Sequence, residues 1–168
     1  MKTTISIFLL ATLFFCACQQ PAPQEGPGEP SYGAEAFVRV QGPDLIQPDG
    51  TKLLIRGTNL GNWLNPEGYM FGFSRTNSAR MINEMFCQLA GPDFTAQFWK
   101  AFKDNYITRG DIEFIASTGA NTIRLPFHYK LFTDEDYMGL NAAQDGFARI
   151  DSVVNWCRDN HLYLILDM

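Results

Sequence analysis

The chain has 168 residues, a formal net charge of −5 at pH 7 and a composition that is 46% hydrophobic and 14% aromatic. These proportions are typical of a globular domain and exclude a largely disordered chain. Proteins that bind nucleic acid usually carry a stripe of basic residues. Lysine and arginine form no cluster in this sequence, so this class of protein is excluded.

The amino terminus, residues 1–18, has the pattern of a secretory signal. A short cationic start precedes an apolar stretch at 5–15, which is too short to span a bilayer. The end of this stretch resembles a bacterial lipobox, with cleavage before Cys18 and lipid on its thiol, although Phe15 stands where that motif usually has Leu. An ordinary cleaved signal and an uncleaved anchor are the alternatives. Two or more acyl chains would hold the protein on a membrane, so we expect a lipoprotein of the bacterial outer membrane or cell surface.

Residues 19–32 are rich in Pro, Gln, Gly and Glu. Such a segment cannot bury enough apolar surface to fold, so it is predicted to be a tether. The folded part is expected at 33–168, which is about the length of one ordinary domain.

Cysteine and histidine give little sign of metal chemistry. Cys87 and Cys157 are the cysteines that remain after the signal, and an exported protein could pair them. Two buried free thiols are the alternative. His128 and His161 are isolated in the sequence, so neither a metal site nor a cofactor is expected.

The start of the folded part predicts a small hairpin that leads into a core strand. A strand is predicted at 37–40, Leu and Ile follow at 45–46, and Gln-Pro-Asp-Gly at 47–50 is a strong turn signal. The next strand is predicted at 52–57. The stretch at 57–74 is rich in Gly, Asn and aromatic residues, and long loops of this kind are often functional.

Helices and strands alternate through the rest of the chain. Apolar spacing and end signals predict helices at 78–89, 92–102, 108–119 and 145–160. Strands are predicted at 121–126 and 162–168. Within the second helix, Phe94, Phe98 and Phe102 fall at four-residue spacing and are expected to pack on one face.

The third helix carries the clearest boundary signals. Thr108 and Asp111 have the spacing of a capping box, and Gly119 provides a left-handed stop. The final run at 162–168 is almost continuously apolar, which is typical of a parallel strand covered on both faces. Alternating helices and strands predict parallel pairing with right-handed crossovers. Both an open doubly wound sheet and the first part of a (β/α)8 barrel fit this order.

The segment at 57–64, Gly-Thr-Asn-Leu-Gly-Asn-Trp-Leu, separates these two folds. A dinucleotide-binding sheet needs a glycine fingerprint after its first strand, but Trp63 stands where the backbone would have to approach a phosphate. The same segment closely resembles glycoside hydrolase family 5, the family of cellulases and exo-β-1,3-glucanases, in which G-x-N-L-G-x-W-L follows the first barrel strand.

Two further blocks carry the resemblance. A pattern typical of the family stands here as Ile107-Thr108, Asp111, Ile115-Ala116, Gly119, Asn121, Arg124 and Pro126. The block at 150–168 resembles the helix and third strand that come next. The resemblance covers essentially everything after Gly33. It implies an α/β fold, a (β/α)8 TIM barrel of which the first three or so β/α units are present, with its site at the carboxyl ends of the strands.

The resemblance implies a glycoside hydrolase that cleaves β-glucans with retention of configuration. Two glutamates about 5–5.5 Å apart act as nucleophile and acid/base in that mechanism. In the family they lie at the ends of the fourth and seventh strands, whereas this chain reaches the third. We therefore expect an inactive amino-terminal piece of an exported enzyme. A non-catalytic carbohydrate-binding protein and a self-associating half-barrel are the alternatives.

The resemblance also implies particular site residues. Arg124 matches the arginine that hydrogen-bonds the nucleophilic carboxylate and keeps it ionised; a structural salt bridge at the barrel rim is the alternative. Glu67 and Tyr69 match positions that bind sugar in exo-acting relatives, although Gly68 replaces the proline of that element. A surface loop with one acid and one packed tyrosine is the alternative for this pair.

Four more residues are candidates for contact with a β-glucan oligosaccharide or polysaccharide. Asn59 and Trp63 match the first loop of the family, and Trp63 can serve either as a sugar platform or as a plug in the core. His128 and Tyr129 follow the second strand on the face of the expected cleft. Tyr129 matches an aromatic residue common in relatives, whereas His128 is either a ligand contact or a polar residue satisfied within the protein.

Overall fold

The computed structural model describes residues 36–139 and 142–168. The predicted signal, with Cys18, and the whole of the predicted tether at 19–32 therefore lie outside the described residues. The described residues fall into two compact units, divided between Thr51 and Lys52.

The described part of the first unit is a β-hairpin. Strand β1 (Arg39–Gln41) pairs antiparallel with β2 (Asp44–Ile46). Gly42, in the link between them, has φ 59°, a left-handed conformation that glycine adopts without steric cost. After β2 the Gly50 N–H donates to the Gln47 carbonyl at 3.0 Å, which closes a turn. The predicted hairpin and turn are confirmed.

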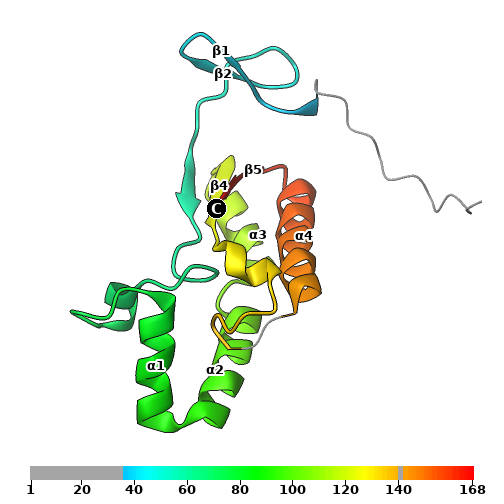
Figure 1. Ribbon diagram of the computed structural model, residues 1–168. Helices are drawn as coiled ribbons and strands as arrows, with labels where there is room; N and C mark the ends of the chain where they lie inside the picture. The colour runs from blue at the N-terminus through cyan, green and yellow to red at the C-terminus, as the bar shows by residue number, and fades with distance from the viewer. Residues whose placement is uncertain (1–35, 140–141) are drawn as a thin grey trace, which may run out of the picture. The chain divides into compact units, whose positions relative to one another are not determined.

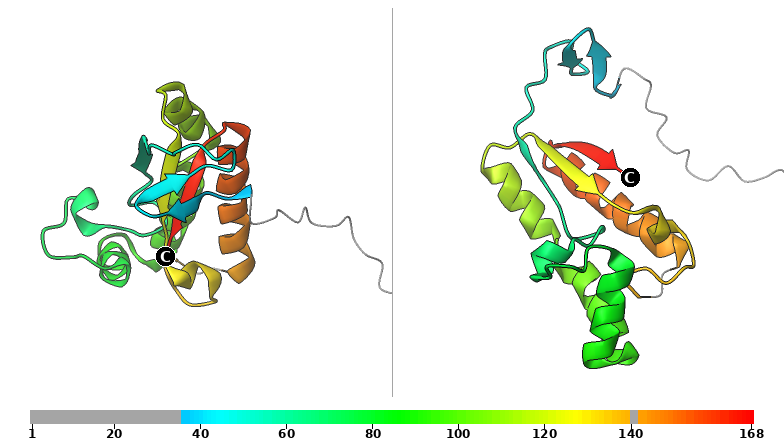
Figure 2. Two further views of the ribbon diagram at one scale, coloured as in Figure 1. Left: turned by 90° about the horizontal axis from the view of Figure 1, so that it is seen from above. Right: turned by 60° about the vertical axis from the view of Figure 1, so that its left-hand side comes forward.

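The second unit is built on a parallel sheet of β3 (Gly57–Asn59), β4 (Thr122–Pro126) and β5 (Tyr163–Asp167), in that order (Figure 1). Parallel neighbours need a crossover connection. Here α3 (Arg109–Ser117) precedes β4 and α4 (Ala143–Asp159) joins β4 to β5. Figure 2 shows both helices along the same side of the sheet. The predicted alternation and parallel pairing are confirmed, and the carboxyl ends of the strands meet at one edge.

The first core strand begins later than the sequence predicts, at Gly57 instead of residue 52. The backbone before it is bonded to the side chain of Asn121. The Arg56 N–H donates to Asn121 Oδ1 at 2.8 Å, and Asn121 Nδ2 donates to the Leu54 carbonyl at 2.9 Å. The asparagine side chain thus supplies partners to this backbone, while the Arg56 carbonyl accepts from the backbone N–H groups of Asn121 at 2.8 Å and Thr122 at 3.2 Å. Regular strand pairing with β4 begins one residue later, at Gly57.

A helical hairpin separates β3 from α3. It consists of α1 (Ala79–Ala90) and α2 (Pro92–Asn105), and Figure 1 shows it beyond the carboxyl ends of the strands. Ser78 caps α1, because its hydroxyl accepts a hydrogen bond from the Met81 N–H at 3.3 Å. Gly91, at φ 87°, makes the turn between the two helices. Both helices and the serine cap agree with the sequence prediction.

The predicted capping box of α3 is present. The Thr108 N–H donates to the Asp111 carboxylate at 2.7 Å, and the threonine hydroxyl donates to the same oxygen at 2.8 Å. After the last turn, Gly119 at φ 85° donates its N–H to the Ala116 carbonyl at 3.0 Å. These contacts satisfy backbone groups at both ends of the helix, as the sequence predicts.

The core of the second unit lies between the sheet and its helices and continues into the helical hairpin. Its largest side chains with no exposure at all are Trp63, Leu64, Ile82, Trp99, Ile112, Ile123 and Leu125. Trp99 is surrounded by aromatic rings, and its Nε1 donates to Asn83 Oδ1 at 2.8 Å. Phe98 and Phe102 pack against this tryptophan as predicted, whereas Phe94 is 61% exposed because it lies near the tip of the hairpin.

The last strand differs from its prediction in burial. Strand β5 forms where the apolar run predicts it, but Ile165 is 41% exposed and Leu166 is 49% exposed. Among residues 36–139 and 142–168, β5 pairs with β4 alone, so one edge of the strand and part of its side chains remain accessible. Within the described residues, no helix has the length and apolar character needed to cross a membrane.

Candidate functional site

Polar side chains from all three strands meet at the carboxyl edge of the sheet. Asn59 on β3 pairs in register with Arg124 on β4, and Asp167 ends β5. The Arg124 guanidinium donates to Asn59 Oδ1 at 3.4 Å and forms an ion pair with Asp167. The side chains of Arg124 and Asp167 are both 42% exposed, so the cluster is open to a ligand.

This cluster unites two predicted residues, Asn59 and Arg124, with one that was not predicted. The sequence motifs place Asp167 only in the third strand, although a carboxylate at the end of an apolar parallel strand is a signal for this edge. The ion pair between Arg124 and Asp167 is a salt bridge at the rim of the sheet, which is the second of the two interpretations of Arg124 given above. A guanidinium carries five N–H donors, and Asn59 and Asp167 take two of them. The arginine is therefore suited to hold a second anionic group.

Glu67 is fixed by a reciprocal pair of hydrogen bonds with Asn62 in the loop after β3. The Asn62 N–H donates to Glu67 Oε1 at 3.2 Å, and the Glu67 N–H donates to Asn62 Oδ1 at 2.9 Å. Asn62 is 3% exposed and has φ 62°, which asparagine tolerates better than most residues. A Cβ on Gly61 would lie 3.1 Å from Glu67 Oε1, so the loop fits closely around the carboxylate.

Tyr69 lies beside this carboxylate. A hydrogen bond with Glu67 raises the pKa of the Tyr69 hydroxyl, and the negative charge of Glu67 adds to the effect. Tyr69 is 70% exposed. The predicted pair is thus brought together, with an anchored carboxylate and an outward-facing phenol on the short helix η2 (Gly68–Phe71).

The structure explains why glycine stands at position 68, where the family pattern has proline. A Cβ at this position would lie 1.6 Å from the Thr76 carbonyl oxygen, because the loop folds back on itself there. The Phe73 N–H also donates to the Gly68 carbonyl at 2.9 Å. A side chain would push the two segments apart, so glycine is required for this path of the loop.

Trp63 does not face the site. Its side chain has no exposure, and its Nε1 donates to the Lys103 carbonyl at 2.9 Å. The ring is therefore a plug in the core, the alternative that the sequence left open, and it offers no surface to a sugar. Physically, an indole buried on all sides and satisfied by a backbone acceptor gains more from packing than from exposure.

Three stacked rings follow β4. The His128 ring lies 4.6 Å from the ring of Tyr129 and 4.7 Å from that of Tyr137, centroid to centroid. Tyr129 is 51% exposed, at the start of the short helix η3 (Tyr129–Phe132), whereas Tyr137 is buried. The sequence identified His128 and Tyr129 but not Tyr137, since a tyrosine within an irregular connection carries no periodic signal.

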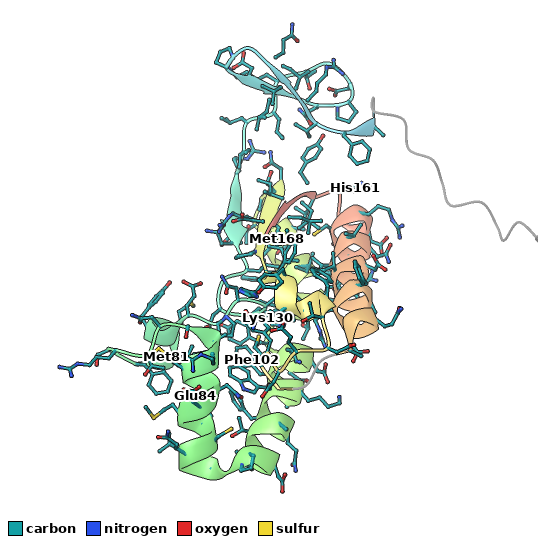
Figure 3. The ribbon with its side chains drawn as sticks, in the orientation of Figure 1. Met81, Glu84, Phe102, Lys130, His161 and Met168 are labelled. Carbon is teal, nitrogen blue, oxygen red and sulfur yellow. The ribbon has the colours of Figure 1, made fainter. Side chains whose placement is uncertain are left out.

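The stack lies at the end of the sheet where the other candidates gather. The His128 N–H donates to the carbonyl of Leu64, at 3.3 Å, in the same loop that carries Glu67. Figure 3 shows Lys130, from η3, on the side of the sheet that faces α1 and α2, and His161 at the opposite end. His161 is therefore remote from the candidate site.

Neither of the two cysteines in the described residues is in a disulfide bond. Cys87 and Cys157 are both free, and burial raises the pKa of the Cys157 thiol to about 11. This is the free-thiol alternative, and a thiol of such pKa is unreactive at neutral pH. Within 36–139 and 142–168, no group of three or more His, Cys, Asp or Glu side chains could hold a metal ion.

Comparison with solved structures supports a barrel architecture. The crystal structure of rutinosidase from Aspergillus niger matches with a TM-score of 0.50 and 20% identity, over 67% of this chain and 32% of that one. At this level of identity the likeness concerns the fold alone. The parallel sheet with its crossover helices matches the first part of an α/β barrel.

Comparison with protein families identifies the chain more closely. The family model described as cellulase, glycosyl hydrolase family 5, matches residues 80–168, which is just over half of the 168 residues. The chain belongs to glycosyl hydrolase family 5. This confirms the resemblance and the TIM-barrel fold class that the sequence motifs indicated.

Curated relatives with several glycosidase names are similar to this chain. A "Beta-xylosidase" of Phanerodontia chrysosporium is 30% identical over 133 residues, 79% of this chain and 27% of that protein. "Endoglucanase C" of Acetivibrio thermocellus is 41% identical over 71 residues, covering 42% and 20%. A "Glucan 1,3-beta-glucosidase" of Lachancea kluyveri is 27% identical over 172 residues, covering 96% and 37%. The chain thus spans between a fifth and two fifths of the length of these relatives.

Proposed function

We propose that this chain forms the first three β/α units of an exported glycoside hydrolase that cleaves β-glucans with retention of configuration. Membership of glycosyl hydrolase family 5 supports the reaction class, and the names of the endoglucanase and glucan glucosidase relatives support the substrate class. The observation that carries the proposal is the carboxyl edge of the sheet, where Arg124 lies in reach of an added anion and Glu67 is presented with Tyr69.

Arg124 is assigned the support of the nucleophile. A retaining glycosidase needs one carboxylate that stays ionised and attacks the sugar, and a second carboxyl group about 5–5.5 Å away that acts as acid and base. A guanidinium beside the first lowers its pKa through charge and hydrogen bonds. The family resemblance assigns both glutamates to the fourth and seventh strands, whereas β3, β4 and β5 are the first three.

Glu67 and Tyr69 are assigned to sugar binding. The carboxylate of Glu67 is committed to the Asn62 backbone and the Tyr69 hydroxyl, and it belongs to the loop of the first strand. Both facts disfavour a nucleophilic role. An ionised carboxylate has about four acceptor sites, so Glu67 can still accept hydrogen bonds from sugar hydroxyls beside these two donors. An exposed phenol ring can stack on a pyranose.

One experiment tests the proposal through two measurements on the same samples. Laminari- and cello-oligosaccharides are titrated against the purified chain, and binding and released reducing sugar are recorded together. We expect weak binding and no hydrolysis. The Glu67→Gln variant should bind about 10-fold or more weakly, because hydrogen bonds to a charged group contribute about 1.5–3 kcal/mol.

Two results would count against this assignment. Release of reducing sugar that the Glu67→Gln variant abolishes would show that Glu67 is catalytic. Equal binding by the unaltered chain and the Glu67→Gln variant would show that the sugar lies elsewhere.

The membrane anchor is a separate part of the proposal. Cys18 lies outside the described residues, and the lipobox-like sequence that precedes it supports lipid attachment at its thiol. We expect the chain to incorporate a labelled fatty acid in a bacterial host and to partition with membranes, and we expect Cys18→Ala to lose both. A Cys18→Ala variant that still carried the label would refute the assignment.

A self-associating half-barrel is the second candidate function. The observation that favours it is the exposure of Ile165 and Leu166 on β5, which lies at an edge of the sheet in this chain. Edge strands and exposed apolar surfaces favour pairing with another copy.

A further inference from the structure

A stack of three rings runs from the interior to the surface at the carboxyl end of β4. Tyr137, 5% exposed, forms its inner end, and Tyr129, 51% exposed, forms its outer end. The His128 ring lies between them, inclined by 29° to Tyr129 and by 21° to Tyr137. The exposed ring therefore has a flat support behind it.

The inner ring is anchored to the loop that follows β3. The Tyr137 hydroxyl lies 3.4 Å from the Leu64 carbonyl oxygen and 3.4 Å from Asn65 Oδ1, and the Tyr137 N–H donates to the Gly139 carbonyl at 3.1 Å. Burial raises the pKa of Tyr137 above its ordinary value, so the hydroxyl stays protonated and remains a hydrogen-bond donor. The base of the stack is thus tied to the first loop.

The surroundings of the middle ring favour its neutral form. His128 Nδ1 accepts a hydrogen bond from the Lys130 N–H at 3.2 Å, which requires that nitrogen to carry no hydrogen. The ring is then the neutral imidazole with its hydrogen on Nε2. Burial lowers the pKa of His128 and the Lys130 charge adds to this, while Glu135 opposes it. The other rings that face His128 are those of Tyr129 and Tyr137.

We infer that His128 is a positioning residue, whose neutral ring, stacked on Tyr137, holds Tyr129 as a preformed flat surface for a sugar ring. This rests on the proposed function, because it assumes that the Tyr129 face contacts the saccharide. An unsupported tyrosine would lose its side-chain freedom on binding. Ordering one such side chain in advance is expected to improve affinity by about 2- to 10-fold.

The arrangement makes binding sensitive to pH in a definite direction. Protonation places a hydrogen on Nδ1, so that it faces the Lys130 N–H, and adds a positive charge near the Lys130 ammonium. The hydrogen bond is then lost and the stack loosens. Because the pKa of His128 lies below its ordinary value of 6.5, the ordered stack is fully present above that pH. Binding should weaken as the pH falls through the lowered pKa.

A matched pair of variants separates stacking from hydrogen bonding. His128→Phe keeps a flat ring between the tyrosines, whereas His128→Asn keeps an acceptor for the Lys130 N–H but removes the ring. The purified chain, both variants and Tyr129→Ala are titrated with a laminari-oligosaccharide at pH 7 and pH 5. At pH 7 we expect Tyr129→Ala to bind at least about 10-fold more weakly. His128→Asn should lose about 2- to 10-fold, and His128→Phe should bind more tightly than His128→Asn.

The results at pH 5 complete the test. Binding by the unaltered chain should weaken, and His128→Phe should remove that part of the pH dependence. If binding by His128→Phe weakens at pH 5 as much as binding by the unaltered chain, the pH dependence arises from another group. This result would overturn the role of the neutral imidazole. NMR of the unaltered chain gives a second readout, in which His128 and Tyr129 ring protons should shift with one shared midpoint below pH 6.5; independent midpoints would contradict the inference.

Failure of this inference can be told apart from failure of the proposed function. If Tyr129→Ala loses binding while His128→Asn retains it, the sugar site stands and the positioning role is refuted. If the unaltered chain binds no oligosaccharide, or if Tyr129→Ala binds as tightly as the unaltered chain, the Tyr129 face is not the sugar surface. Both the assignment of Tyr129 and the inference then fall.

Discussion

Asn62, in the first loop, combines three structural features that fix the position of Glu67. It adopts a left-handed backbone conformation, it is almost completely buried, and it exchanges two hydrogen bonds with Glu67. The Asn62 side-chain oxygen accepts the hydrogen bond of the Glu67 backbone N–H. The position of the candidate sugar-binding carboxylate therefore depends on a neighbour that contacts no sugar.

Replacing Asn62 should destabilise the protein by two separable effects. Asn62→Ala removes the acceptor for the Glu67 N–H, which costs about 1 kcal/mol, and places alanine in a left-handed conformation at a further cost of about 1–2 kcal/mol. Asn62→Gly removes the acceptor alone, since glycine tolerates the backbone angle. We expect urea unfolding to show a larger loss of unfolding free energy for Asn62→Ala. Equal losses in the two variants would show that backbone strain plays no part.

The residues of the site differ in how far the sequence could predict them. Glu67 and Tyr69 are close in sequence, so the short helix that brings them together follows from local structure. Tyr137 stacks on His128 across an irregular connection, and Asp167 reaches Arg124 from another strand. Such contacts depend on tertiary packing, which a single sequence does not encode in any local pattern.

At the scale of elements, helices were predicted more reliably than strand limits. The capping box and Gly119 mark α3 through local hydrogen bonds, and local bonds leave a readable pattern. The start of β3 depends instead on Asn121, whose side chain bonds the preceding backbone from 65 residues away in the sequence. Long-range partners of this kind explain why the predicted strand began at residue 52 while the observed one begins at Gly57.

The capping box of α3 should give the chain an acid-sensitive contribution to stability. Hydrogen bonds from the Thr108 hydroxyl and backbone N–H lower the pKa of Asp111 from its ordinary value, so the ionised form is favoured in the folded state. This contribution is complete above the unfolded pKa, about 3.9, and is lost as the pH falls through the lower folded value.

We therefore expect Asp111→Ala to reduce unfolding free energy at pH 7 by about 0.5–1 kcal/mol, the usual size of a cap. The difference from the unaltered chain should shrink as the pH falls below 4. Glu113→Ala is the matched control on the same helix, because Glu113 makes an exposed pair with Arg109 and caps nothing. Thermal unfolding between pH 3 and pH 7 measures both variants, and a constant difference for Asp111→Ala across that range would contradict the account.

At the scale of the whole molecule, the sheet determines how the chain should behave in solution. Leu166 is 49% exposed on β5, which lies at an edge of the sheet in the described part of the chain, and an exposed apolar edge favours pairing with a second copy. We expect sedimentation velocity to show association that grows with concentration.

Leu166→Lys should weaken this association about tenfold or more, since burying an unpaired charge is costly. Phe114→Lys, at a residue 70% exposed on α3, is the control and should associate like the unaltered chain. A chain that stays monomeric at every concentration would show that no self-association surface exists. Association that Phe114→Lys weakens and Leu166→Lys leaves intact would show that the surface lies away from the sheet edge.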